Sequence, residues 1–328
     1  MTTQLPLNSY PENGEVKHPV NKRRVKLLEP LLLLAPAGFW LLLMLVLPTL
    51  IIFQLSLVPG IRPGELVNPG GVSSFWEFIL RWGEDGYLRR VWFALTENYR
   101  RILDPLFLQV IWRSLILAAS TSIICLLLGF PVAYWITQIA PKRWRTLLLL
   151  GFVLPLWTSS LLRTYAWITI LRPSGLLNLV LNNFGLPSLQ ILDTLPAVVI
   201  GMSYSLLPYM VLILYASLEK LDTRLLEAAA DLGANPFQAF WRVTIPQVRT
   251  GIFAGGFMVL ITALGDFVNP ELLGGVSSMT AARLIYTQFL GASKNWGFGS
   301  ALSMTLIFAV SIAIALLIKF GDTSVRSK

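Results

Sequence analysis

The segment LLEAAADLGANPFQAFWRVTIPQ, residues 225–247, differs from the sequence on either side of it. It carries charged side chains and a Gly-Ala-Asn-Pro turn, whereas the whole chain of 328 residues is 55% hydrophobic and has a mean hydropathy of +0.66. Only 13% of the residues are charged, about half the share that is usual in soluble domains. The composition predicts an integral membrane protein, with this segment as a polar insert between two spans.

The insert has the local signals of two short helices joined by a tight turn. Asp222 or Thr223 can cap the first helix, and Gly233 stands where a helix commonly ends. Asn235 and Pro236 then supply the cap and the first-turn residue of a second helix. Three aromatic residues of this helix share one face: Phe237, Phe240 and Trp241.

Two interpretations of the insert are open on the residues alone. The small residues Ala228–Ala230 allow a partner to approach closely, and an amphipathic helix can dock in a partner's groove. An ordinary cytoplasmic loop explains the same residues equally well. In either case we expect Pro246 to end the second helix.

Long uncharged stretches around the insert predict six membrane-spanning helices, since about 20 apolar residues cross a bilayer. We place these helices at about 31–53, 114–137, 146–170, 194–218, 249–269 and within 295–318. Residues 173–192 are also uncharged, but their asparagines, glycine and proline favour a short surface helix over a seventh span.

Lysine and arginine flank the spans unevenly, which predicts that both termini and the insert are cytoplasmic. The net charge of +9 is then explained by orientation in the membrane and not by binding of nucleic acid. In the first outer loop, FWEFILRW (75–82) and YLRRVWFAL (87–95) are typical of helices lying in the membrane interface.

The expected fold class is all-α, with five consecutive regions. These are a cytoplasmic tail (1–28), a first transmembrane helix (29–53), an outer loop with interfacial helices (54–112), a five-helix core (113–320) with a cytoplasmic loop at 219–247, and a C-terminal tail (321–328).

The residue inventory argues against catalysis by this chain. Cys125 lies in an apolar run and His18 is the one histidine, so we expect no disulfide, no metal site and no histidine-based catalytic residues. No lysine follows a glycine, so the phosphate-binding loop of ATPases is absent from the sequence.

The spacing Glu227-Ala228-Ala229, three residues, Gly233, nine residues, Val243-Thr244-Ile245-Pro246 resembles the EAA motif of ABC importer permeases. The family pattern is E-A-A-x3-G-x9-I-x-L-P, from which Val243 and Ile245 depart conservatively. The resemblance implies a MetI-like fold and a coupling helix that docks on an ATP-binding subunit. The residues that it assigns to docking are Glu227, Ala228, Ala229, Gly233, Asn235, Pro236 and Pro246.

Further segments resemble one branch of that family, the permeases of spermidine/putrescine importers. They are NYRRILDP (98–105), RTYAWITILRPSGLLN (163–178), SYSLLPYMVLILYASLEKLD (203–222), LGDFVNPELLGG (264–275) and NWGFGSALSM (295–304). The resemblance implies polyamine import across the bacterial inner membrane. It also implies four kinds of partner: a second homologous permease subunit, two ATP-binding subunits that use ATP and Mg, a solute-binding protein outside the cytoplasm, and membrane lipid.

Candidates for the solute path are one buried acid, a second acid beside it and four aromatic residues. Asp266 falls inside the fifth predicted span, where carboxylates are costly and often functional, but a structural ion pair with Arg163 is an equal alternative. We expect Glu271 to face the outer vestibule. The aromatic residues, which suit either cation–π contacts or ordinary packing, are Trp157, Tyr165, Tyr204 and Tyr209.

Two alternatives to polyamine import are open. An ABC permease for another solute, such as a different cationic amine or an opine, has the same features. A secondary transporter needs its own ion site at broken helices, for which the candidates are Pro131, Pro155, Pro196 and Pro208. A secondary transporter would transport when expressed alone.

Overall fold

The computed structural model describes residues 22–57, 87–275, 278–291 and 294–321. Every regular element in these ranges is a helix, which confirms the all-α prediction. The chain divides into two units, Met1–Ile51 and Ile52–Lys328. The predicted tails and the interfacial helix at 75–82 lie outside the described residues.

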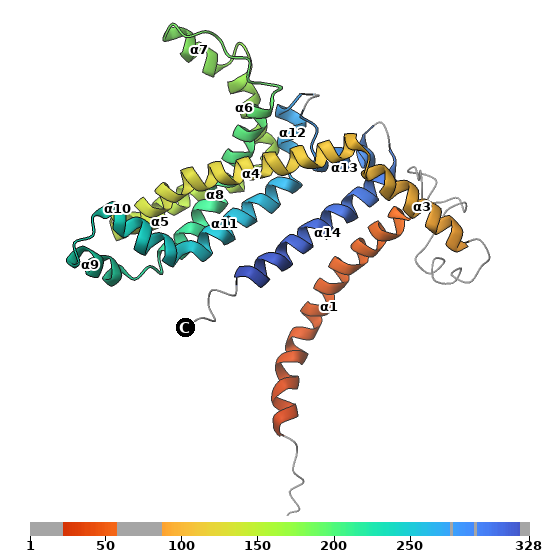
Figure 1. Ribbon diagram of the computed structural model, residues 1–328, viewed down its shortest axis with the longest axis horizontal. Helices are drawn as coiled ribbons and strands as arrows, with labels where there is room; N and C mark the ends of the chain where they lie inside the picture. The colour runs from red at the N-terminus through yellow and green to blue at the C-terminus, as the bar shows by residue number, and fades with distance from the viewer. Residues whose placement is uncertain (1–21, 58–86, 276–277, 292–293, 322–328) are drawn as a thin grey trace, which may run out of the picture. The chain divides into compact units, whose positions relative to one another are not determined.

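The first unit holds most of α1 (Lys22–Ser56), drawn in red and orange in Figure 1. This helix begins before the predicted start at residue 29. Its part Ala35–Ser56 is long and apolar enough to cross a membrane, and most of its large hydrophobic side chains are exposed. Exposure of an all-round apolar helix is what a lipid-facing span requires.

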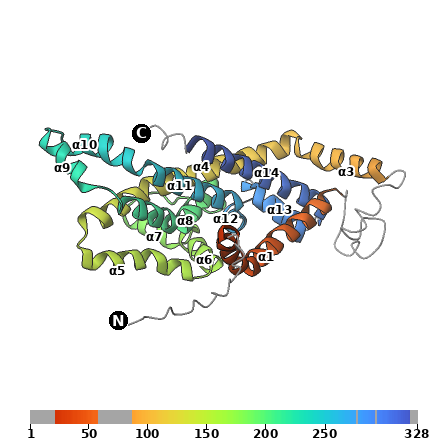
Figure 2. The ribbon, with the colours of Figure 1, turned by 90° about the horizontal axis from the view of Figure 1, so that it is seen from below.

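The second unit is built on three helices that lie side by side (Figures 1 and 2): α4 (Pro105–Tyr134), α8 (Leu195–Leu218) and α11 (Ile245–Gly265). A Cβ atom added at Gly129 of α4 would lie 3.1 Å from Met210 Cγ, and one at Gly255 of α11 would lie 2.9 Å from Met210 Sδ. The glycines therefore let both helices close on the α8 methionine, as small residues do in membrane bundles. The Ser122 hydroxyl of α4 also donates to the Gly256 carbonyl of α11 at 2.7 Å.

The third predicted span, at 146–170, is bent in its middle and is not one straight helix. It consists of α5 (Lys142–Val153), a 3₁₀ turn (Leu154–Trp157) and α6 (Ser160–Leu171), with a bend of 93°. Pro155 lies in the 3₁₀ turn, and Thr158 and Ser159 leave the helical region with ψ angles of 148° and 135°. Proline removes one helical hydrogen bond to the preceding turn, and the chain leaves the helix just after it, at Thr158.

The stretch 173–192 forms the predicted short helix, α7 (Leu176–Asn183), rather than a long span. Asn178, which is buried, closes the following loop by two hydrogen bonds to Leu189: its amide donates to the Leu189 carbonyl at 3.0 Å, and its carbonyl accepts from the Leu189 N–H at 2.8 Å. Figure 1 shows α6 and α7 leading away from the α4–α8–α11 bundle.

Among the described residues, four helices are long and apolar enough to cross a membrane, and the bent pair makes five if it counts as one span. The sixth predicted span falls in α14 (Trp296–Gly321), whose apolar part Trp296–Ile312 is shorter. The total of six spans therefore stays a prediction.

Helix α4 begins at Pro105, inside the predicted outer loop, which extends to residue 112. The predicted interfacial helix at 87–95 is part of α3 (Tyr87–Ile102). The Asn98 amide donates to the Ser56 carbonyl at 2.9 Å, and the Tyr99 hydroxyl donates to Ser56 Oγ at 3.1 Å. These bonds attach α3 to the residues that end α1.

Candidate functional site

The polar insert lies at one end of the α4–α8–α11 bundle. Its helices α9 (Thr223–Asp231) and α10 (Pro236–Ala239) are at that end, whereas α12 (Val268–Leu273) and α13 (Ala281–Leu290) are at the opposite end (Figures 1 and 2). The EAA-like motif and Asp266 are thus placed at the two ends of the bundle.

The predicted caps of the insert are confirmed. Asp222 Oδ1 accepts the Arg224 N–H at 3.0 Å, and Gly233 has a φ of +83°. Asn235 forms a capping box: its side chain accepts the Gln238 N–H at 2.8 Å, and the Gln238 side chain accepts the Asn235 N–H at 3.1 Å. The turn between α9 and α10 is therefore defined by its own residues.

Pro246 does not end the second helix, so that prediction is wrong. The chain is helical without a break from Pro236 to Gly265, through a π-helical turn at Phe240–Thr244. The Ile245 N–H bonds to the Phe240 carbonyl, five residues back. The wider turn leads into α11 with Pro246 in its first turn, where the missing N–H costs least. The insert is thus continuous with a membrane-spanning helix.

The surface of the insert exposes both the motif and large apolar side chains. Glu227, Ala228, Gly233, Asn235, Pro236 and Pro246 are exposed, and Ala229 is half-buried. Leu232, which follows α9, is 89% exposed, and Phe237 is 71% exposed. Apolar exposure of this degree at the polar end of a bundle is typical of a surface that a partner covers.

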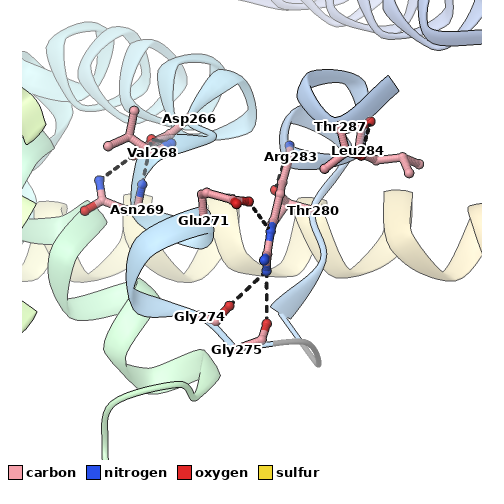
Figure 3. A network of polar contacts seen from close by, with 10 residues as sticks. All are labelled: Asp266, Val268, Asn269, Glu271, Gly274, Gly275, Thr280, Arg283, Leu284 and Thr287. Carbon is pink, nitrogen blue, oxygen red and sulfur yellow. Dashed lines mark hydrogen bonds and ion pairs between the residues drawn. The ribbon is translucent and has the colours of Figure 1, made fainter. Parts of the chain in front are cut away.

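At the other end of the bundle, Asp266 caps the break between α11 and α12 (Figure 3). Its Oδ1 accepts the N–H groups of Val268 at 2.9 Å and of Asn269 at 3.3 Å, and its Oδ2 accepts the Asn269 side-chain amide at 2.6 Å. The buried Asn269 in turn accepts the Thr164 hydroxyl at 3.2 Å, which joins α12 to α6.

The alternative pairing of Asp266 with Arg163 is not formed. The Nε and Nη1 atoms of Arg163 are buried and have no hydrogen-bond partner among the described residues. The Asp266 carboxylate is instead held by Val268 and Asn269, as above.

Glu271 and Arg283 form an ion pair that closes the loop after α12 (Figure 3). Arg283 Nε lies 2.5 Å from Glu271 Oε2, and Arg283 Nη1 donates to the carbonyls of Gly274 at 2.9 Å and Gly275 at 3.0 Å. The Arg283 side chain is 15% exposed and the Glu271 side chain 36%. Glu271 therefore reaches solvent but already has a cationic partner.

The four aromatic candidates are exposed and do not gather into one cage. Trp157, at the 93° bend, is 78% exposed, and Tyr165 on α6 is 54% exposed. Tyr204 on α8 packs its ring against Trp167 at 5.6 Å, and no ring contact joins two of the four. Their side chains are available to lipid, to another subunit or to a solute.

Comparison with known proteins decides the family. Residues 126–325 match the model described as "Binding-protein-dependent transport system inner membrane component". The chain belongs to this family. The permease proteins PotB of the spermidine/putrescine transport systems of Haemophilus influenzae and Escherichia coli K12 are among its relatives. The first is 45% identical over 240 residues (72% of this chain, 82% of the relative), and the second is 41% identical over 220 residues (66% and 79%).

The fold of this permease is also found in a solved structure. A bacterial alginate ABC transporter, in complex with an alginate pentasaccharide-bound periplasmic protein, contains a chain that superposes with a TM-score of 0.62. The alignment covers 90% of this chain and 93% of the other at 18% identity, so it shows the fold alone.

Three residues of the permease that hold the end opposite the insert were missed by sequence reasoning: Thr164, Asn269 and Arg283. Asn269 follows an Asx turn, in which the Asp266 side chain accepts the N–H group two residues on, and aspartate is common in such turns. Arg283 had no local signal, because its partners lie in another element.

Proposed function

We propose that this chain is the translocating subunit of an ATP-driven importer of polyamines of the spermidine and putrescine type. The observation that carries the proposal is the 45% identity to a protein named as a spermidine/putrescine transport system permease, over 82% of that protein's length. The aligned 240 residues are 72% of this chain.

We propose in addition that the complex contains a second homologous permease subunit, two ATP-binding subunits and an extracytoplasmic solute-binding protein. The exposed Leu232 and Phe237 beside the EAA-like motif support docking of an ATP-binding subunit on residues 222–246. ATP and Mg are used by that subunit, and this chain binds no cofactor. Movement of the docked segment then tilts the spans and opens the path to each side in turn.

In the proposed topology the protein lies in the bacterial cytoplasmic membrane with both termini and the insert on the cytoplasmic side. The support is the concentration of lysine and arginine in the tails and in the connections 138–145 and 219–249. The loop held by Arg283 is then on the outer side, where solute arrives.

The test is uptake by the whole complex in proteoliposomes. The complex is purified through an affinity tag on this chain, reconstituted with the solute-binding protein, and supplied with ATP on the cytoplasmic face and labelled spermidine on the other. We expect accumulation that needs hydrolysable ATP and that unlabelled putrescine competes away. Competition by an opine but not by putrescine would assign a different solute, and uptake by this chain alone without ATP would make it a secondary transporter.

A further inference from the structure

Five aromatic rings form a continuous chain from the surface of the insert to the side of α4. We call Phe237, Trp241, Phe240, Phe130 and Tyr134 the aromatic chain. Ring centroids are 6.2 Å apart for Phe237 and Trp241 and 5.6 Å apart for Trp241 and Phe240. Phe240 then contacts Phe130 at 5.6 Å and Tyr134 at 5.9 Å, edge to face in both cases.

Burial increases along the aromatic chain. Phe237 and Trp241 are exposed at the surface where the ATP-binding subunit is proposed to dock. Phe240 is half-buried, as are Phe130 and Tyr134, which pack against the bundle core. Phe240 is therefore the ring that joins the exposed end of the aromatic chain to α4.

Irregular helix lies on both sides of the Phe240 contact. Phe240 begins the π-helical turn that leads into α11. On α4, Pro131 lies between the two contacted rings, and a second π-helical turn, Trp135–Ile139, follows Tyr134 directly. Proline removes a backbone hydrogen bond and π turns lengthen others, so α4 bends more easily here than along its regular part.

The covalent connections of the insert show which helices it moves directly. The insert is joined directly to α11 by unbroken helix and to the end of α8 by a short link, Glu219–Asp222. It has no direct chain connection to α4, which is a major part of the bundle core. A push on the insert reaches α4 through packing, and the Phe240 contact is one route beside the packing of α8 and α11 on α4.

We propose that Phe240 transmits movement of the docked insert to α4, which bends at Pro131 and the adjoining π turn. This inference rests on the proposed function, because it needs an ATP-binding subunit on the insert. Phe240 acts as a positioning residue and contacts neither nucleotide nor solute. Its ring packs against the stacked pair Phe130 and Tyr134 of α4, so displacing Phe240 displaces these rings and the helix that carries them.

The test compares assembly, ATP hydrolysis and uptake for Phe240→Ala in the reconstituted complex with labelled spermidine as solute. We expect the ATP-binding subunit to co-purify at the wild-type level and hydrolysis to continue, while uptake per ATP hydrolysed falls by about tenfold, within the usual range of coupling effects. Phe240→Trp, which restores a ring, should recover most of the ratio. Phe152→Ala is the matched control, because Phe152 is a half-buried ring that packs on the core and makes no ring contact with the aromatic chain.

A second pair of variants approaches the same contact from α4. The double variant Phe130→Ala and Tyr134→Ala should lower the uptake per ATP hydrolysed as much as Phe240→Ala does. Adding Phe240→Ala to it should cause no further decrease. If the Phe240→Ala complex does not assemble, the α4 variants still test whether this contact transmits movement.

Three outcomes would overturn the inference. If the assembled Phe240→Ala complex takes up as much solute per ATP hydrolysed as the wild type, Phe240 does not transmit the movement. Loss of the ATP-binding subunit from Phe240→Ala but not from the α4 double variant makes Phe240 a docking residue and leaves the proposed function intact. A wild-type complex that neither hydrolyses ATP nor takes up solute contradicts the proposed function itself, and the inference with it.

Discussion

At the scale of single residues, replacing Gly233 tests whether docking depends on the backbone conformation of the turn. Its φ is +83°, and a Cβ atom added there would meet nothing within 4 Å. Gly233→Val should therefore strain the turn by about 2 kcal/mol through its backbone conformation, with no clash at Cβ. We expect less ATP-binding subunit to co-purify and slower uptake.

Gly233→Asn is the control for this prediction, because asparagine tolerates positive φ better than valine. It should keep co-purification and uptake close to wild type. Equal and normal behaviour of the valine and asparagine variants would contradict a role for this turn in docking.

Asp266 gives a second prediction at this scale. Asp266→Asn removes the negative charge while Oδ1 can still accept the Val268 and Asn269 N–H groups. If the charge attracts a polycation, the KM for spermidine should rise more than the KM for putrescine, which has one amine fewer. Assembly and basal ATPase should persist.

The structure also predicts that Arg163→Gln does not rescue Asp266→Asn, since the two side chains form no ion pair. Equal changes in KM for the two polyamines would assign Asp266 to holding α12 rather than to attracting solute. Rescue by Arg163→Gln would show a pairing in another state of the transporter.

At the scale of elements, Arg283 holds the loop between α12 and α13. Arg283→Gln loses the ion pair to Glu271 and weakens two bonds to backbone carbonyls, so we expect a loss of stability of about 2–4 kcal/mol. Glu271→Gln keeps an acceptor on a partly exposed side chain and should cost about 1 kcal/mol or less. Thermal unfolding of the purified complex measures both, and the reverse order would contradict the assignment.

The elements also show how far the sequence predicts this protein. The caps at Asp222 and Asn235 were predictable because their bonds lie within three residues of chain. The effect of each proline on its helix was not predictable from the sequence. Pro155 lies at a 93° bend, Pro208 lies inside unbroken α8, and Pro246 lies in the first turn of α11. Packing partners decide between these outcomes, and they come from distant elements.

The same reason limits prediction of the two sites. The EAA-like motif is contiguous, so its residues could be named in advance, and the structure places them on one exposed insert. The restraint of Glu271 by Arg283 depends on the loop that brings α13 back to α12. Such a contact becomes visible only in three dimensions.

At the scale of the whole molecule, the topology decides on which side of the membrane the insert and the termini lie. Reporter fusions after residue 190 and after residue 328 should lie outside and inside the cell respectively, because the basic residues gather on the side of the insert. A C-terminal reporter on the outer side would mean that the number of spans is not six.

Crosslinking in the assembled complex tests directly whether an ATP-binding subunit docks on residues 222–246. A photoreactive residue replaces Leu232, which is 89% exposed at this end of the bundle, and the same residue replaces Leu162, which is 68% exposed on α6, as the control. We expect position 232 to crosslink to the ATP-binding subunit and position 162 not to. A complex that transports normally while position 232 stays free of the ATP-binding subunit would contradict docking on this segment.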